Sequence, residues 1–397
     1  SNRLGGYGGT DNATQRAISM NVIGFNNLID NTTKRNHILG NLWFQVEILK
    51  GLKYKIAGSF DRLEVQNRRY VPQSDLGWYY VTEAAEASLD ISNSNLTKTI
   101  LDNLLTYDIT LGNHKVDALA GYIQQNTDFY NHYSRGVGYP TGTIPEIQYA
   151  QATNGISAGE YKSKETAKSY IGRLNYSYND LYFITGNFRQ DKSSKFAPEN
   201  NTGNFYGVSG AWKLSNEKFM HLPTWFNTIK LRGGYGELGN NTIGLYAYAS
   251  TLNSFSSYNF NGKLANGTTS IRTTDPDISW ETTATTNVAI DLAFFDNKLQ
   301  FTGEYYIKKS TDLLLNFPIP YSTGSISYVN NGFANPDIET NAASIENKGL
   351  EFTASYRNSD HAFKYGISTN ISFLKDKVLN LGKTNSPIYG AASKTEV

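Results

Sequence analysis

The sequence predicts an all-β protein: an antiparallel transmembrane β-barrel, of which about twelve strands lie in this chain. Three observations favour this fold class. Apolar and polar residues alternate over stretches of about ten positions, as they do in strands. Short turns alternate with long polar connections. The composition is low in hydrophobic (39%) and charged (18%) residues and contains 28 Tyr against 5 Trp, which suits strands with polar loops.

The alternation recurs from residue 39 to residue 373. Its clearest stretches are 42–48, 52–60, 170–178, 182–189, 287–294, 299–305 and 363–373. A tilted membrane strand needs about 9–11 residues, which matches these lengths. The residues before 38 and after Lys375 read as loop, so both ends of the strand pattern look unfinished.

The turns between these stretches favour a barrel. Tight turns are predicted at Lys50-Gly51, Gly112-Asn113, Asn179-Asp180, Asp296-Asn297 and Asn358-Ser359-Asp360, where the residue types tolerate a positive φ. Long polar loops are predicted at 63–97, 125–165, 238–278 and 310–344, with a shorter loop at 192–203. A longer turn at 214–225 could open a short helix at Ser215-Asn216-Glu217. Outer-membrane barrels alternate short periplasmic turns with long outer loops in this way.

A soluble all-β sandwich, propeller or adhesin is the alternative, because its strands also alternate. Such folds rarely place all their long loops on one side. The chain has no Cys, which excludes disulfides and thiolate zinc sites. The net charge of +1 implies no nucleic-acid partner, and no apolar run of about 18 residues predicts a transmembrane helix. Residues 1–12 lack an apolar export signal, and together with the unfinished ends this favours a fragment.

Several sequence blocks resemble, in order, the C-terminal half of SusC/RagA-like TonB-dependent receptors. The segment 189–196 (RQDKSSKF) resembles the family pattern R-x-D-G-S-S-R-F, and 345–351 (IENKGLE) resembles V-E-N-K-G-x-E. The other matching blocks are 207–215, 231–240, 275–283, 287–295 and 305–314. Lys192 and Ala343 stand where the family usually has Gly, and the loop 331–340 looks longer than usual. Residues 1–180 match the family less distinctly but continue the same alternation of strands, short turns and long loops.

The resemblance implies a barrel of about 22 strands, an N-terminal extension, a TonB box and a plug domain. None of the last three is in the chain, so we expect residues 1–397 to be a partial barrel domain that lacks the plug and the C-terminal strands. The implied protein lies in the bacterial outer membrane among its lipids. It imports oligosaccharides, sometimes peptides, captured with a SusD-like lipoprotein and released when TonB pulls the plug. It has no cofactor and is not an enzyme.

Two alternatives stay open. The protein could be a TonB-dependent receptor for metal chelates or cobalamin-like ligands, which a neighbouring SusD-like gene would argue against. It could also be a soluble or surface-anchored adhesin or glycan-binding module, which would stay soluble without detergent.

Two sets of residues are candidate contact sites. Aromatic rings on the predicted outer loops can stack on sugar faces: Trp78, Tyr79, Tyr80, Tyr130, Tyr133 and Tyr139. The alternative, favoured by the many aromatic residues of this chain, is that these loops pack on one another or on a partner. Basic residues predicted to face the lumen could contact a plug or a substrate, or simply form a polar wall: Arg173, Arg189 and Arg232.

Other motifs carry no chemistry. The segment 234–239 reads as G-x-G-x-x-G, but no helix pattern follows it, so we interpret it as glycines at a strand end. The five His residues are scattered without metal-ligand spacing. Asp275, Asp277 and Glu281 lack the calcium-loop pattern and are interpreted as a loop that closes onto a strand. No nucleophile motif or catalytic triad can be argued from spacing.

Overall fold

The computed structural model of the protein describes residues 8, 20–83, 85–151, 155–250, 252–270, 273–318, 327–329, 332–334, 337–360 and 362–382. Twelve strands form one sheet in the order β1-β2-β5-β6-β7-β8-β9-β10-β13-β14-β17-β18. The order follows the sequence, so each hairpin adds the next strand. This confirms the predicted all-β antiparallel class and the predicted number of strands.

Most strands of the sheet are longer than the predicted 9–11 residues. They are β1 (Asp30–Leu49), β2 (Leu52–Val71), β5 (Ser88–Leu111), β6 (His114–Val137), β7 (Ile156–Tyr178), β8 (Tyr182–Ser193), β9 (Thr202–Trp212), β10 (Phe226–Asn240), β13 (Glu281–Phe294), β14 (Leu299–Pro318), β17 (Asp337–Asn358) and β18 (Tyr365–Asn380). β5 and β6 have 24 residues each. The predicted loops at 63–97, 125–165 and 310–344 were therefore wrong in extent. The alternation marks only the part of a strand with one apolar face, whereas the hydrogen-bonded ladder continues where both faces are polar.

The beginning of the strand pattern was also predicted too late. Helix α1 (Val22–Leu28) precedes β1, and the side chain of Asn21 caps it by accepting from the backbone N–H of Gly24 at 2.8 Å. β1 then begins eight residues before residue 38. Most of the segment 1–12, part of the loop 331–340 and His361 lie outside the described residues.

The chain divides into two compact units. The first comprises residues 1–42, 57–101 and 125–165, and the second comprises 43–56, 102–124 and 166–397. The first contains α1, the short strands β3 (Ser74–Asp75) and β4 (Val81–Thr82), and the 3₁₀ helix η1 (Ile147–Tyr149). The second contains the hairpins β11 (Leu252–Phe260)–β12 (Lys263–Ser270) and β15 (Ser327–Val329)–β16 (Gly332–Ala334), and the 3₁₀ helix η2 (Leu214–Asn216). Among the described residues, no helix has the length and apolar character needed to cross a membrane.

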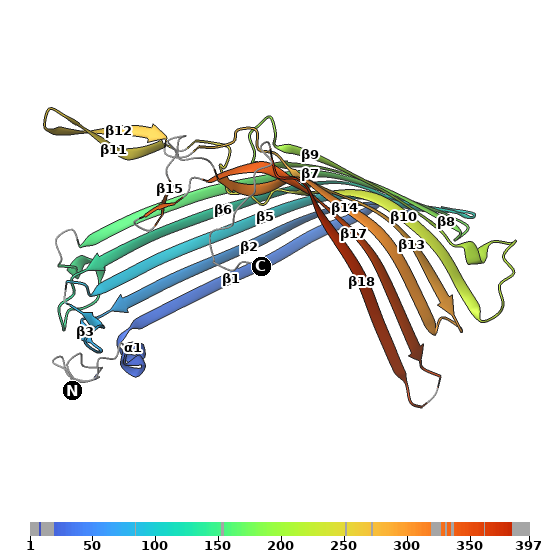
Figure 1. Cartoon of the computed structure of the whole chain (residues 1–397), viewed down its shortest axis with the longest axis horizontal. Coiled ribbons are helices and arrows are strands. Elements are labelled where there is room, and N and C mark those ends of the chain that lie inside the picture. Colours follow the sequence, from blue (N-terminus) through green and yellow to red (C-terminus); the bar gives the residue numbers. More distant parts are fainter. Residues whose placement is uncertain are drawn as a thin grey trace. The chain divides into compact units, whose positions relative to one another are not determined.

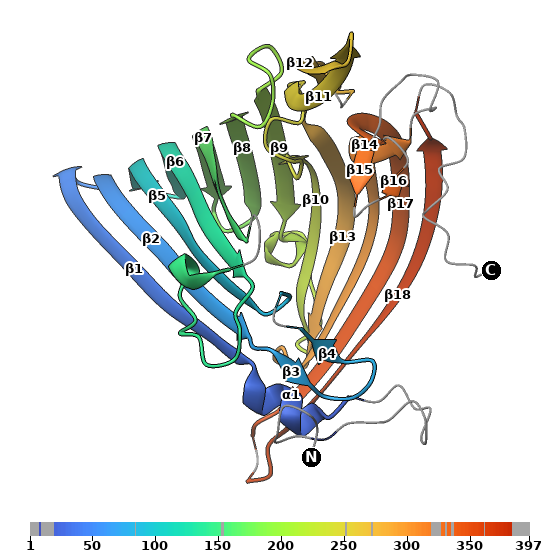
Figure 2. The ribbon, with the colours of Figure 1, turned by 90° about the vertical axis from the view of Figure 1, so that its left-hand side faces the viewer.

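The tight turns lie where they were predicted. Gly51 (φ 83°), Gly112 (φ 58°) and the pair Asn179 and Asp180 (both φ 52°) adopt the left-handed backbone that these residue types tolerate. In the turn between β13 and β14, residues 295–297 all have positive φ. The longer turn at 214–225 does contain a short helix, η2. Figures 1 and 2 show β13, β14, β17 and β18 side by side as successive hairpins.

The register gives the strands of the second unit two different faces. On β7, β8, β9 and β10, Leu174 lies opposite Gly186, Gly186 opposite Val208, and Val208 opposite Tyr235. This apolar face exposes Tyr170, Leu174, Ile184, Val208 and Val288. The alternate positions form the polar face, which carries Arg173, Asn187, Ser209, Arg232 and Asn287. Aromatic rings line up near the short turns, where Tyr182 stacks on Tyr178 and Trp212.

Candidate functional site

Arg232 is the centre of an ion-pair network on the polar face of the second unit. From β10, its Nε donates to Oδ2 of Asp291 at 3.2 Å and its Nη2 to Oε2 of Glu304 at 2.7 Å. Asn287 donates to the other oxygen of Glu304 at 2.7 Å, and Thr302 donates to the other oxygen of Asp291 at 3.0 Å. All four carboxylate oxygens therefore accept a hydrogen bond, which is the arrangement that makes a half-buried ion pair stable.

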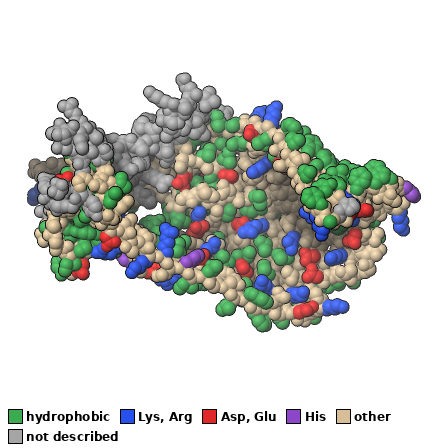
Figure 3. Space-filling model, turned by 90° about the horizontal axis from the view of Figure 1, so that it is seen from below, with side chains coloured by type: hydrophobic (Ala, Val, Ile, Leu, Met, Phe, Trp, Pro, Cys, Tyr) green, Lys and Arg blue, Asp and Glu red, His purple; other side chains and the backbone are tan. Residues whose placement is uncertain are grey.

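The other two predicted arginines also lie on the polar face and also pair with acids. Arg173 lies 3.7 Å from Asp117, which accepts a hydrogen bond from Asn175 at 2.7 Å. Arg189 donates to Asp191 at 2.7 Å and to Ser169 Oγ at 3.2 Å. Each of the three arginines thus has an acidic partner, so the charge that these arginines bring to the polar face is paired. Basic and acidic side chains also lie interspersed over the face seen in Figure 3.

The sequence interpretation missed the acids of these pairs. Alternation within 287–294 and 299–305 puts Asp291 and Glu304 on the polar side of their strands, but nothing in the sequence marks them as partners of Arg232. The signal that could have found these pairs is the presence of basic and acidic residues on the same face of neighbouring predicted strands. Whether the arginines contact a plug or a substrate remains a prediction.

A groove of about 290 Å³ lies beside Arg232 on the polar face. Small side chains at Ser209 and Ala211 leave this space open. Lys230 adds a positive charge at its edge, next to the Arg232 guanidinium that Asp291 and Glu304 neutralise. Thr185 and Asn287 supply a hydroxyl and an amide. The groove can therefore hold a polar, hydrogen-bonding group from a solute or from another protein segment.

Replacing Arg232 should destabilise the sheet more than replacing Arg173. We expect Arg232→Gln to lower the free energy of unfolding by about 2 kcal/mol, because two carboxylates lose their shared partner. Arg173→Gln should cost less than about 0.5 kcal/mol, since Arg173 is more exposed and lies 3.7 Å from a single carboxylate. Urea unfolding of the full-length protein in detergent measures both. Equal effects would contradict a structural role of the Arg232 network.

An aromatic cluster packs between connections of the second unit, at the strand ends that lie opposite the short turns. Phe196, in the connection between β8 and β9, is 2% exposed and lies 5.2 Å from the ring of Trp280. Phe205 of β9 meets Trp280 edge-on at 5.7 Å. Trp280 Nε1 donates to the backbone oxygen of Asn201 at 3.1 Å. A side chain at Gly239 would overlap the ring of Phe205, which explains a glycine there.

Further hydrogen bonds near this cluster involve two of the sequence blocks that resemble the family, 275–283 and 305–314. Asn341 of β17 accepts from the backbone N–H of Ser279 at 2.8 Å and donates to the backbone oxygen of Asp312 at 2.7 Å. Thr340 donates to Asp275, and Glu281 accepts from the backbone N–H of Leu314 at 3.1 Å. These contacts match the interpretation of Asp275 and Glu281 as a loop closing onto a strand. The segment 234–239 lies within β10, as a strand rather than a phosphate loop.

The predicted aromatic contacts do not form one site. Trp78, Tyr79 and Tyr80 lie together between β3 and β4, with ring centroids 5.6 and 5.5 Å apart, and Tyr79 is 62% exposed. Tyr130 and Tyr133 lie in β6 and not in a loop, because β6 continues to Val137. Tyr130 donates to Glu160 at 3.3 Å, and the ammonium of Lys162 lies 5.1 Å from its ring.

Tyr139 is buried in the first unit. Its ring packs with Ala87 and Leu89 and meets Tyr70 edge-on at 5.8 Å. Its hydroxyl donates to the backbone oxygen of Glu146 at 3.1 Å, and burial raises the pKa of this phenol. Tyr139 therefore holds the connection between β6 and β7 in place, the packing role that was weighed against substrate contact.

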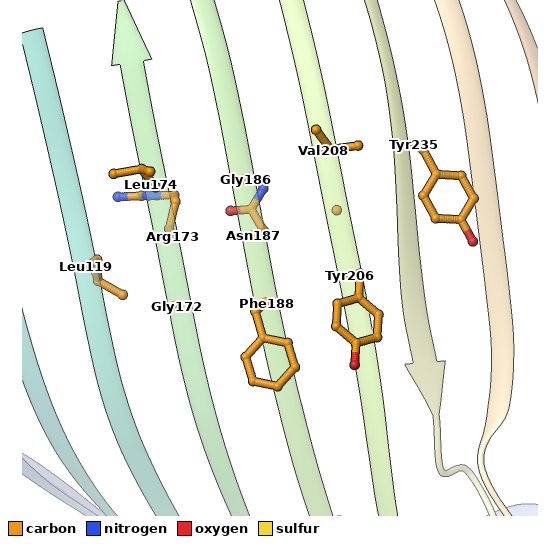
Figure 4. A pocket seen from close by; sticks show the side chains of 11 residues that line it. Leu119, Gly172, Arg173, Leu174, Gly186, Asn187, Phe188, Tyr206, Val208 and Tyr235 are labelled. Carbon is orange, nitrogen blue, oxygen red and sulfur yellow. The ribbon is translucent and has the colours of Figure 1, made fainter.

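The apolar face carries a shallow depression of about 490 Å³ (Figure 4). Its floor is open because Gly172 and Gly186 have no atom near the position of a Cβ. Most of the surrounding side chains are apolar or aromatic, among them Leu174, Phe188, Tyr206, Val208 and Tyr235, and Arg173 and Asn187 also line the depression. Because this face is apolar, the depression belongs to the surface that meets lipid in a membrane barrel and not to a path for polar solutes.

Comparison with known proteins agrees with this architecture. The family model described as "TonB dependent receptor-like, beta-barrel" matches residues 2–393. The TonB-dependent receptor P26 of Formosa agariphila is 30% identical over 388 residues, which cover 96% of this chain and 37% of that receptor. The TonB-dependent receptor SusC of Bacteroides thetaiotaomicron is 28% identical over 293 residues, 71% of this chain and 27% of SusC.

The solved structure of the RagAB peptide transporter has the same fold, with a TM-score of 0.79 and 20% identity over 90% of this chain and 38% of that chain. This chain spans about a third of the length of the curated relatives it matches. The comparisons confirm the resemblance found in the sequence blocks. They place the chain in the outer membrane, within a family of receptors rather than of enzymes. The chain belongs to the TonB-dependent receptor β-barrel family.

Proposed function

We propose that this chain forms part of the barrel wall of a SusC-like importer, which moves oligosaccharides or other large nutrients, such as peptides, into the periplasm. The observation that carries the proposal is the contrast between the two faces of the second unit. One face is apolar, and the other is polar with its arginines paired to acids. Arginines that are neutralised by neighbouring acids suit large, neutral, hydrogen-bonding cargo better than a strongly charged solute.

The partners of this importer are proposed to be a SusD-like lipoprotein and TonB, the latter acting through a plug domain. The resemblance to SusC and to the RagAB transporter supports both. We also propose that β1 and β18 pair with further strands of the full-length protein. All residues of both strands are exposed, and an unpaired strand edge is not tolerated in lipid.

The cluster Trp78–Tyr79–Tyr80 is the proposed place where substrate is first held. Its neighbouring rings meet edge-on, and all three are exposed. We expect Tyr79→Ala to raise the apparent KM of uptake about three- to tenfold, because a stacking ring is lost. Tyr79→Phe keeps the ring and should behave like the unchanged protein. An unaltered KM in Tyr79→Ala would remove this cluster from the substrate path.

Growth of a deletion strain tests the function itself. The gene is deleted in its host, and growth is measured on purified oligosaccharides, on peptides, and with iron chelates or cobalamin as the limiting nutrient. The proposal expects loss of growth on one class of oligosaccharide or peptide, restored by the full-length gene but not by a version lacking its TonB box. Affinity purification of the full-length protein should recover a lipoprotein. A defect confined to iron chelates or cobalamin would favour the alternative receptor class.

A further inference from the structure

Strands β14, β17 and β18 are neighbours in the sheet (Figure 2) and continue the apolar face of the second unit. Val288, which is exposed on that face, pairs with Tyr305 of β14. Tyr305 pairs with Leu350, and Leu350 pairs with Phe373, so these three side chains form one apolar row across the strands. Each of them is exposed. The row therefore belongs to the surface that meets lipid in an outer-membrane barrel.

Lysines follow this apolar row directly. Lys348 and Lys375 lie two residues beyond it in β17 and β18, and they pair with each other across the strands. Lys309, Glu346 and Lys377 lie four residues beyond it and form the next row. Because all these spacings are even, the side chains lie on the lipid side of the sheet. We call Lys309, Lys348, Lys375 and Lys377 the lysine patch.

The depth of the lysine patch matches the outer edge of the membrane. The patch lies toward the long connection between β14 and β17 and away from the short turns, which is the outer side of such a barrel. Tyr356 pairs with Leu299 beside the short turns, and Lys348 and Glu346 lie eight and ten residues further along β17. That is about 26–33 Å of strand, or about 20–25 Å of height at a tilt of about 40°. The apolar band of an outer-membrane barrel is about 25 Å tall, so the lysines lie at the level of the outer headgroups.

The lysine patch carries more positive charge than its neighbours neutralise. Nζ of Lys348 lies 3.0 Å from Oε1 of Glu346, which is the one acid that β14, β17 and β18 contribute to these two rows. Lys309, Lys375 and Lys377 form no ion pair with any residue that the structure describes. Lys348 and Lys375 also face each other directly, and like charges in that position destabilise a sheet. An anion bound beside them would relieve this repulsion.

The other acids nearby leave this charge in place. Asp376 lies between two lysines in the sequence, but alternation puts it on the opposite face, where Asn347 donates to its carboxylate. Glu237 of β10 shares the lipid side but is separated from β14 by β13, which puts the two strands about 10 Å apart. Its carboxylate accepts a hydrogen bond from the hydroxyl of Tyr235. The patch therefore keeps a net positive charge.

We propose that the lysine patch binds the phosphate groups of a lipid in the outer leaflet of the outer membrane. The alkyl stems of the lysines can lie along the apolar band while their ammonium groups reach the headgroups, and basic residues at a membrane surface attract anionic lipids. The acyl chains of the same lipid would contact Leu350 and Phe373, a contact that a soluble anion cannot make. The proposal rests on the outer-membrane location and does not depend on the transported substrate.

Binding is tested with the full-length protein in detergent micelles, into which phosphorylated lipid A is titrated as the probe. Lys309→Gln and Lys375→Gln are each expected to raise the Kd about fivefold, the effect of one lysine beside a charged membrane surface. Glu346→Gln is expected to lower the Kd by a similar factor, because it removes the acid that neutralises Lys348. Lipid A without its phosphates should bind weakly and equally to all these variants.

The matched control is Lys308→Gln. Lys308 is exposed and adjacent to Lys309 in β14, and alternation puts it on the polar face. Its replacement should leave the Kd unchanged, and heat-modifiable migration on gels confirms that each variant is folded. Equal Kd values for Lys308→Gln and Lys309→Gln would overturn the proposal, and so would displacement of lipid A by inorganic phosphate at the same phosphate concentration. Nutrient uptake, measured in parallel, tests the import function separately.

Discussion

Phe196→Ala is expected to raise the population of the locally opened connection between β8 and β9 by at least about a hundredfold. Phe196 is 2% exposed and packs on Trp280, and removing such a ring from a packed cluster costs about 3–5 kcal/mol. The population of the locally opened connection should rise by roughly a hundredfold for each 2.8 kcal/mol or so. Lys195 is the adjacent tryptic site, so the rate of cleavage after Lys195 in the full-length protein measures this opening.

The control for this prediction is Phe219→Ala. Phe219 lies in the turn before β10 and is 63% exposed, so its removal should leave tryptic cleavage after Lys195 unchanged. Gly239→Ala should act in the same direction as Phe196→Ala, since the new methyl group would push the ring of Phe205 away from Trp280. Unchanged cleavage in both Phe196→Ala and Gly239→Ala would show that the aromatic cluster does not hold this connection.

Gly51→Ala is expected to destabilise the protein by about 3 kcal/mol or more. Gly51 has a φ of 83°, which costs an L residue about 1–2 kcal/mol. A Cβ there would also overlap the backbone oxygen of Asp108 in β5, which adds about 1–3 kcal/mol of overpacking. Asp108 donates its N–H to the oxygen of Gly51 at 2.9 Å, so the strand cannot move away without losing this bond. Urea unfolding in detergent measures the loss.

Two other glycines separate the cost of the positive φ from the cost of the overlap with Asp108. Gly112 has a φ of 58°, but no atom lies within 4 Å of the place that a Cβ would occupy. Gly112→Ala should therefore lose only the stability that a positive φ costs an L residue, about 1–2 kcal/mol. Gly58 has neither feature, and Gly58→Ala should stay within about 0.5 kcal/mol. The expected order of stability is therefore Gly58→Ala, then Gly112→Ala, then Gly51→Ala. Similar values for Gly112→Ala and Gly51→Ala would rule out the overlap with Asp108.

Local patterns in the sequence predicted much of the fold. Side-chain alternation has the period of a strand, and it located the apolar stretches because each residue's face depends only on its place along the strand. The tight turns were predictable for the same reason, since a positive φ at Gly51 or Asn179 is a property of the residue itself. The blocks at 189–196 and 345–351 indicated the family through their residue order alone.

The strand lengths and the burial of loop residues were not predictable in this way. β6 continues to Val137 through residues that have no apolar face. Alternation of apolar and polar residues cannot detect this part of the strand, although its backbone hydrogen bonds continue. Tyr139 looked like an exposed loop aromatic, yet it is buried against Tyr70, which lies 69 positions earlier in the numbering. Such burial depends on which distant segment a loop meets.

By itself, the sequence determined the all-β class, the alternation of faces, the positions of the tight turns and the family. Only the tertiary structure decided which charges pair, which loops pack and where a pocket opens. Arg232 and Glu304 are 72 residues apart in the sequence and meet only because the register of β10, β13 and β14 aligns them. Faces are set by the local geometry of a strand, whereas partners are set by register between strands, and register is a property of the folded sheet.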